Sequence, residues 1–540
     1  MKGFALKYKD KALYIVTTIL FFVIGFMNVK YCNAGHSYQQ DVPFRIICIC
    51  IALIALIHLP LKDTLTVWSL IWLPICYVIT HIGYEKHLIP DNCDYQFVDL
   101  IRLGKLVVLL WGLMLIALLK HLVREDLPGK FFSWLISLDI LKKTAVAGWC
   151  IYALVLTAVN PGYSYVIVFT LGFPAVIIAC RGEKERKRLF SAFLDGVLLC
   201  FLVLSAKSLL HRPYDTERYL FYFSNENMAG MYLSVVMITL IYRIEKAWKT
   251  EKSGPRTVYL VAGHILIVWA GILVMYNYTR TYLLGMGFSL FVYFCIRVAS
   301  DKEKKRFIFR FFLPVILILL CLYPGYLVIR YVPAYSDSPV FFYGEEGNAN
   351  RVQPGDPVDS PRYTSIKRYF RLAFGKLGIN LDLDDGEERE EQESFVEIDE
   401  DRDVSNGRLT VWKYFLERMS LRPHNPGHIV VGDDWVIYHA HNTYFQNMFQ
   451  FGIPTGVLFA CVIFLTYVFS IHAYVKKRSG SFPLLAIGTM MVGMLTEWSG
   501  HPAYPYGMFL LLVLHVLVFS DPLKKNIEDK ADGGSKVAER

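Results

Sequence analysis

Long apolar runs recur along the whole chain, and this feature limits the possible fold more than any other. A helix that crosses a bilayer needs roughly 17 to 25 mostly apolar residues. The 540 residues are 54% hydrophobic and 19% charged, with a mean hydropathy of +0.37, which disfavours a water-soluble globular domain. We therefore predict an all-α polytopic membrane protein. Its fourteen expected transmembrane helices begin near Ala12, Phe44, Thr64, Gly104, Thr144, Tyr163, Leu189, Asn227, Val258, Thr281, Phe307, Thr455, Pro483 and Tyr506.

The distribution of Lys and Arg predicts the orientation, because short cytoplasmic loops are enriched in these residues. With fourteen spans, all basic clusters fall on one side. The turns 160–162 and 499–505 contain neither Lys nor Arg and fall on the other. Both termini are therefore expected in the cytoplasm and the segment 333–451 outside it. The net charge of +9 then reflects orientation, and no nucleic-acid partner is expected.

The predicted spans divide the chain into five parts. These are the N-terminal transmembrane helices (1–210), the central transmembrane helices with Arg280 at their outer boundary (211–332), an extracytoplasmic loop domain (333–452), the C-terminal transmembrane helices (453–520) and a cytoplasmic tail (521–540). Most cysteines fall inside spans as small buried side chains. Cys32 and Cys93 fall in outer loops, where a disulfide between them is one option.

The loop domain has three expected components. A basic amphipathic helix over 359–378 suits the surface of the outer leaflet. The acidic stretch 381–403 lacks regular calcium-ligand spacing and is predicted to be a disordered, flexible insertion. A helix then opens at Arg408 and ends before Pro423. One face of that helix is expected to carry Leu409, Trp412, Phe415, Leu416 and Met419.

Polar residues with chemical potential gather at the outer ends of the predicted helices. His439 and His441 stand at the rim of an apolar span, and a helix from Asn442 is broken by Gly452 and Pro454. Arg280 sits in a very short outer turn, against the inside bias. It either snorkels to lipid headgroups or serves as a fixed cation for an anionic substrate.

Two further polar residues allow more than one interpretation. Asn227 begins a span and fits a polar helix start. Glu497 fits solvation of a helix end, orientation of a histidine or a salt bridge to an arginine. The four histidines at 424, 428, 439 and 441 do not have metal-ligand spacing, so no metal or other cofactor is expected.

Four motifs in this order resemble the superfamily of O-antigen ligases and O-antigen polymerases, which are bacterial membrane glycosyltransferases. They are SNENMAGMYL at 224–233, YTRTYLLG at 278–285, NGRLTVW at 406–412 and HAHNTYFQNMFQFGIPTG at 439–456. The resemblance covers roughly 214–519. The chain departs from the family, which commonly has around a dozen spans, by its two extra spans and its acidic insertion.

The resemblance implies an enzyme of the bacterial cytoplasmic membrane, with an extracytoplasmic active site that transfers glycan from a polyprenyl-diphosphate carrier to an acceptor hydroxyl. We expect the reaction to be metal-independent, because the arginines supply the positive charge that divalent ions supply elsewhere. Arg280 and Arg408 would bind the diphosphate, and His441 would be the catalytic base. Asn442, His439, Asn227 and Glu497 would support them. The expected product is a capsular or O-antigen-like polysaccharide. The expected partners are the donor, the acceptor, the bilayer and a chain-length regulator.

Three alternatives remain open at this stage. A ligase would use the same groups with a lipid, protein or wall acceptor. A fourteen-helix flippase or exporter of lipid-linked oligosaccharides would concentrate polar residues at the bilayer midplane and show internal repeats, and none is apparent in the sequence. A scaffold protein would make Arg280, Arg408 and His441 dispensable.

Overall fold

The computed structural model describes residues 2–33, 41–85, 104–159, 164–180, 183–210, 219–248, 253–300, 303–333, 407–424, 428–431, 435–476, 480–499, 504 and 507. Several predicted features lie outside these residues and stay predictions. They are the amphipathic helix 359–378, the acidic stretch 381–403, the tail 521–540 and the partner of Cys32 in the proposed disulfide, Cys93.

Within the described part of the chain, eight helices are long and apolar enough to cross a membrane. They are α1 (Lys2–Asn33), α6 (Lys105–Arg124), α8 (Ile140–Val159), α11 (Glu183–Leu210), α12 (Glu226–Trp248), α13 (Ser253–Asn277), α14 (Arg280–Ser300) and α20 (Ile453–Val475). Short helices α3 (Leu61–Thr64), α7 (Leu127–Ser137) and α9 (Ser164–Ile167) connect some of the longer ones.

The remaining predicted spans are less regular. Helices α15 (Lys304–Leu320) and α16 (Leu322–Tyr331) form one span only as a pair bent by 48°. The bend follows from Pro324, whose ring clashes with the carbonyl four residues earlier. Four shorter apolar helices occupy other predicted spans. They are α2 (Asp41–His58), α4 (Val67–Glu85), α10 (Phe173–Ala179) with the π-helical turn η2 (Val168–Gly172), and α21 (Ser481–Gly493). The predicted span near Tyr506 lies outside the described residues.

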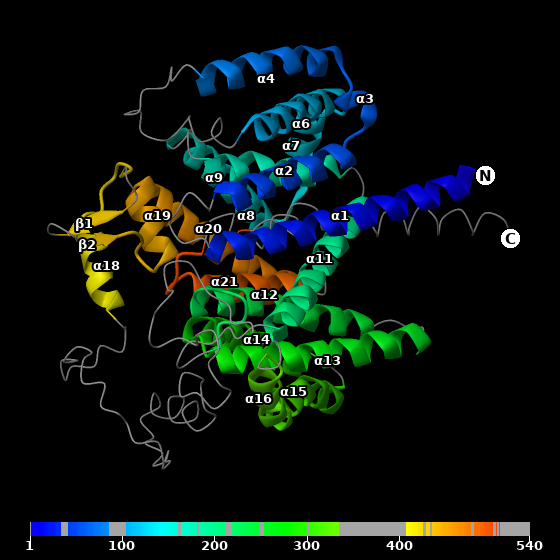
Figure 1. The fold of residues 1–540 in the computed structure, drawn as a ribbon, viewed down its shortest axis with the longest axis vertical. Coiled ribbons are helices and arrows are strands. Elements are labelled where there is room, and N and C mark those ends of the chain that lie inside the picture. Colours follow the sequence, from blue (N-terminus) through cyan, green and yellow to red (C-terminus); the bar gives the residue numbers. More distant parts are fainter. Residues whose placement is uncertain are drawn as a thin grey trace.

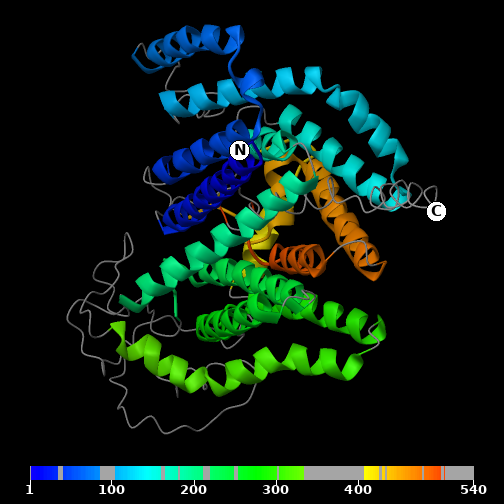
Figure 2. The ribbon, with the colours of Figure 1, turned by 90° about the vertical axis from the view of Figure 1, so that its right-hand side faces the viewer.

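The described part of the chain is thus mostly helical and has the apolar helices of a membrane-embedded protein, eight of them alone or nine with the bent pair. Figure 1 shows the long helices lying roughly side by side, with α18, α19 and the two strands at one end of the bundle. The N-terminal end of α1 lies at the opposite end. In the view of Figure 2, α4 and the α15–α16 pair form opposite flanks.

Helix α21 lies at the centre of the packing that supports the site. Most of its side chains are buried, and it packs against α12, α14 and α20. Close approach to α14 depends on Gly285, where a Cβ atom would come within 2.8 Å of the Thr489 carbonyl oxygen. Because α21 is held on three sides, the residues that follow it are anchored as well.

The segment 407–451 forms a small unit with its own core. Helix α18 (Arg408–Glu417) and helix α19 (Thr443–Phe451) enclose an antiparallel hairpin of β1 (Ile429–Val431) and β2 (Trp435–Ile437). The rings of Phe415 and Phe449 meet at 4.9 Å in this core.

The sequence analysis described this segment incompletely. It did not predict the hairpin, although the Val and Ile residues on both sides of Gly-Asp-Asp at 432–434 are a sequence signal for strands. Of the expected apolar face of α18, Leu409 is 59% exposed and Leu416 is 49% exposed. The helix is too short to bury a wide stripe, and Phe415 provides its fully buried contact.

Candidate functional site

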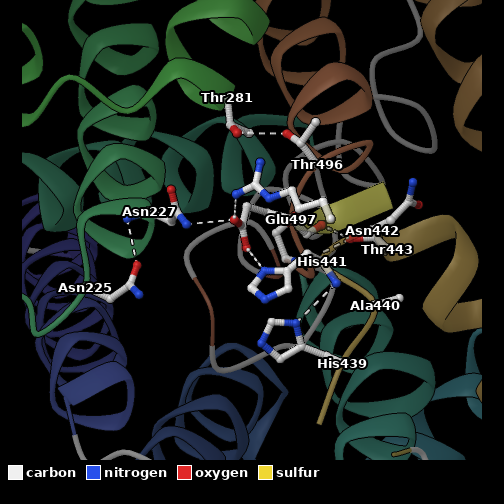
Figure 3. A network of polar contacts seen from close by, with 12 residues as sticks. Asn225, Asn227, Thr281, His439, Ala440, His441, Asn442, Thr443, Thr496 and Glu497 are labelled. Carbon is white, nitrogen blue, oxygen red and sulfur yellow. Dashed lines mark hydrogen bonds and ion pairs between the residues drawn. The ribbon is translucent and has the colours of Figure 1, made fainter. Parts of the chain in front are cut away.

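The carboxylate of Glu497 is the centre of a polar cluster at the end of the bundle that carries α18 and α19. Its Oε1 atom accepts hydrogen bonds from Nη2 of Arg408 and from Nδ2 of Asn227, each at 2.7 Å. Its Oε2 atom lies 3.5 Å from Nδ1 of His441. Figure 3 shows the side chains of Asn227 and His441 pointing toward this carboxylate. Glu497 is only 2% exposed, so solvation of a helix end does not describe its environment.

Each member of the cluster comes from a different element. Asn227 lies in the first turn of α12, Arg408 begins α18, His441 precedes α19, and Glu497 follows α21. The structure therefore brings together four of the residues that the sequence singled out, across long separations in the chain. The guanidinium of Arg408 gives the buried carboxylate an opposite charge, which a buried ionised group requires.

The backbone fixes the position of His441. Its φ angle is 46°, a left-handed conformation that is uncommon for a residue other than glycine. Its N–H donates to Nδ1 of His439 at 3.3 Å, and the two imidazole rings lie 4.1 Å apart in a T-shaped arrangement. The His441 side chain is 39% exposed, so one side of the ring is accessible while Nδ1 faces Glu497.

Asn442 supports the start of α19 through its side-chain amide. Its Oδ1 atom accepts the backbone N–H groups of Tyr444 and Phe445, which makes Asn442 the N-cap of α19. Its Nδ2 atom donates to the carbonyl oxygen of Leu495 at 2.8 Å. Both ends of the amide are thus engaged with backbone, and Asn442 positions His441 through the helix cap.

Thr443 is an important site residue that the sequence analysis missed. Its side chain is fully buried, and its Oγ1 atom donates to the carbonyl of Glu497 at 2.7 Å while accepting the N–H of Ser499 at 3.0 Å. The Thr443 N–H donates to the Met494 carbonyl at 2.9 Å. One residue therefore ties the start of α19 to the segment that carries Glu497. A threonine after an N-cap gives no sequence signal of this role.

Arg280 begins α14 and lies next to the cluster without being the arginine that Glu497 binds. The following residue, Thr281, forms a hydrogen bond with Thr496 at 2.8 Å, directly beside Glu497 (Figure 3). The turn before Arg280 is held to α12, because the carbonyl of Glu226 accepts from Thr279 at 2.8 Å. The two candidate arginines thus stand in different positions, one paired with Glu497 and one at the start of a helix beside it.

Left-handed backbone conformations occur in the loops that lead into the site. Phe221 (φ 54°), Tyr278 (φ 51°) and His441 precede α12, α14 and α19, and Gly407 (φ 76°) precedes α18. Among the described residues, one other non-glycine residue, Asp126, has a positive φ. Such conformations cost energy and persist where surrounding contacts enforce them, which is common at functional sites.

Among the residues that the structure describes, no group of three His, Cys, Asp or Glu side chains is placed to hold a metal ion. The chemistry available in the cluster is that of one carboxylate, one guanidinium and an accessible imidazole. Comparisons of the chain with family models, with curated proteins and with solved structures gave no match.

Proposed function

We propose that the protein is a membrane glycosyltransferase that moves a saccharide from a polyprenyl-diphosphate carrier to an acceptor hydroxyl at the outer face of the membrane. The supporting observation is that Glu497 binds Arg408 and faces His441 at the same time. This arrangement places a potential base and a fixed cation in one cluster. A bacterial cytoplasmic membrane, with both termini inside, is the location that fits this reaction.

His441 is the proposed general base. A carboxylate beside Nδ1 favours the tautomer that carries its proton on Nδ1, which leaves the lone pair on Nε2. Nε2 can then take the proton of an acceptor hydroxyl, and Glu497 stabilises the imidazolium that forms. General-base catalysis of this kind contributes about 100- to 10,000-fold in rate.

Arg408 and Arg280 are the proposed binding groups for the diphosphate. A guanidinium carries five N–H donors, and the bond from Nη2 of Arg408 to Glu497 leaves others for an anion. The planar fork of arginine matches phosphate oxygens in two-point contacts. Because the Arg408 side chain is 24% exposed, it is held on one side by Glu497 and still accessible on the other.

The proposed step balances without an added cofactor. The acceptor oxygen forms a bond to the anomeric carbon of the donor sugar while the bond from that carbon to the diphosphate oxygen breaks. The electron pair of the broken bond leaves with the diphosphate, whose growing negative charge is stabilised by the arginines. The acceptor proton moves to Nε2 of His441 and is later released to solvent.

A polymerase is our preferred form of this enzyme, with a growing lipid-linked glycan as the acceptor. A ligase would use the same cluster with another hydroxyl acceptor. Transport of the lipid-linked glycan fits less well, since transporters place their substrate sites near the bilayer midplane. The cluster described here instead lies at the ends of α12, α14 and α21.

Substitution of His441 tests the proposal. Asparagine tolerates the left-handed backbone, so His441→Asn is expected to fold normally and to lower the transfer rate at least about 100-fold. The assay follows polymer length from purified lipid-linked repeat units in nanodiscs. His472→Asn, at the other end of α20, is the matched control and should be active. Normal polymer from the His441→Asn enzyme would rule out this mechanism.

Metal independence is tested in the same assay. Turnover is expected to continue in excess chelator, because the arginines supply the positive charge that divalent ions supply in other phosphate-transfer sites. Turnover that stops with chelator and returns with an added divalent ion would show that this part of the proposal is wrong.

A further inference from the structure

We propose that Trp498, with His439 and Tyr504 beside it, forms a sugar-binding subsite that holds a pyranose ring of the glycan next to His441. This inference rests on the proposed glycosyltransferase function and assigns the part of the substrate that the charged cluster does not bind.

The backbone presents Trp498 at a fixed place beside the proposed base. Its two neighbours are buried, Glu497 at 2% exposure and Ser499 at 0%. The hydroxyl of Thr443 bonds to the backbone on both sides of Trp498, to the carbonyl before it and to the N–H after it. Trp498 itself is only partly buried. A large ring between two anchored, buried residues has little freedom to move, which lowers the entropy lost when a ligand packs against it.

A row of aromatic rings connects Trp498 with the imidazoles. The His439 ring lies 4.1 Å from that of His441 and 5.7 Å from that of Trp498. Trp498 also meets Tyr504 at 5.9 Å with nearly perpendicular planes. Tyr504 is 8% exposed and contacts the partly buried Tyr31 of α1, also at 5.9 Å. The indole of Trp498 therefore packs against a buried aromatic ring as well as against His439.

This composition suits a carbohydrate ring. One face of a pyranose carries several C–H bonds, which pack on the electron-rich face of an indole, while its hydroxyl groups need hydrogen-bonding partners at the edge. His439 provides one such group, since Nδ1 accepts the N–H of His441 and Nε2 of a neutral ring then carries a proton to donate.

A tryptophan at a membrane boundary is often only a lipid anchor. The ring contacts of Trp498 with His439 of the site and with the buried Tyr504 differ from that role. Trp68 in α4 is 69% exposed and is a suitable comparison for an outward-facing tryptophan.

Direct binding provides the test, with wild-type protein and the Trp498→Ala, Trp498→Phe and Trp68→Ala variants in nanodiscs. The probes are the oligosaccharide released by mild acid from the host's lipid-linked repeat unit, and polyprenyl diphosphate without sugar. We expect Trp498→Ala to bind the oligosaccharide about tenfold more weakly. Binding of the sugar-free carrier should be unchanged. Trp498→Phe should retain most oligosaccharide affinity, and Trp68→Ala all of it.

Each other outcome has a defined meaning. Unchanged oligosaccharide binding by Trp498→Ala would overturn the subsite, whatever the effect on turnover. An equal loss of affinity for both probes would show that Trp498 has a structural role, and it would also overturn the subsite. Oligosaccharide binding that depends on Trp498, in a protein that shows no transfer with or without His441, would support the subsite and reject the proposed enzyme.

Discussion

The carboxylate of Glu497 pairs with the guanidinium of Arg408, faces the imidazole of His441 and accepts a hydrogen bond from the amide of Asn227. A single residue thus contacts both the proposed base and the proposed cation. Sequence reasoning identified all four residues, because an arginine on the outer side and paired histidines at a span boundary are unusual. It left the role of Glu497 undecided, since charge pairing depends on contacts between distant segments.

Glu497→Gln tests this dual role at the residue scale. Glutamine keeps the size and can still accept the Asn227 hydrogen bond, but it removes the charge that orients His441 and holds Arg408. We expect kcat to fall about 100-fold or more. Glu417→Gln is the control, because Glu417 is an exposed partner of Lys413 on α18. Equal activities of the two variants in the polymer assay would contradict the model of the site.

Arg408→Lys tests whether the planar shape of the guanidinium matters in addition to its positive charge. Lysine keeps a positive charge but lacks the planar fork that binds Glu497 and phosphate oxygens together. The expected result is a higher KM for the lipid-linked donor, with a smaller change in KM for the acceptor. Initial rates measured over a range of donor concentrations give this comparison, and wild-type donor KM would argue against a phosphate contact.

At the scale of elements, helices α12 and α14 are held in register by a close approach at Gly230. A Cβ atom there would lie 2.7 Å from Cβ of Thr279 and 3.0 Å from Oδ1 of Asn277, in the turn that leads to Arg280. Gly287, in contrast, has nothing within 4 Å of the same position. The two glycines look alike in sequence, and only the packing distinguishes them.

Gly230→Ala is therefore expected to lower stability by about 1–3 kcal/mol, because overpacking moves the turn that carries Arg280. Activity should decrease with it. Gly287→Ala should leave both unchanged. Thermal unfolding in detergent measures the stability of both variants, and the polymer assay measures their activity. Equal stability and equal activity of Gly230→Ala and Gly287→Ala would show that the close approach at Gly230 does not matter.

The sequence predicted long helices better than short elements for a physical reason. A span of twenty apolar residues gives a strong signal that local context rarely overrides. The strands β1 and β2 have three residues each and depend on pairing with each other and on the core around Phe415. Likewise, the fully buried hydroxyl of Thr443 gains its role only when α19 and the end of α21 meet.

At the scale of the whole molecule, the cluster gathers the ends of α12, α14, α18, α19 and α21 on one side of the bundle (Figure 1). Ion pairs near the other ends, such as Arg188 with Asp10 and Arg243 with Asp195, hold α1, α11 and α12 together. Arg188 and Arg243 belong to the basic clusters 181–188 and 243–256, which the sequence predicts to be cytoplasmic. The structure fixes which ends lie together, while the sequence predicts which side faces the cell interior.

Reporter fusions test that orientation. Alkaline phosphatase fused after Pro333 is expected to be active, because it would lie outside the cytoplasm, whereas a fusion after Lys249 should be inactive. A fluorescent protein that folds only in the cytoplasm should give the opposite result at each position. Reversed activities would place the cluster inside the cell, where the proposed carrier reaction does not belong.

The position of Glu497 in the chain has a consequence for biogenesis. Arg408 and His441 are translated before Glu497, and the hydroxyl of Thr443 gains its partner only with the same later segment. A nascent chain that stops after α20 therefore contains the start of α19 but lacks the carboxylate that joins the cluster. Assembly of the cluster must accordingly follow the insertion of α21 beside α12 and α14.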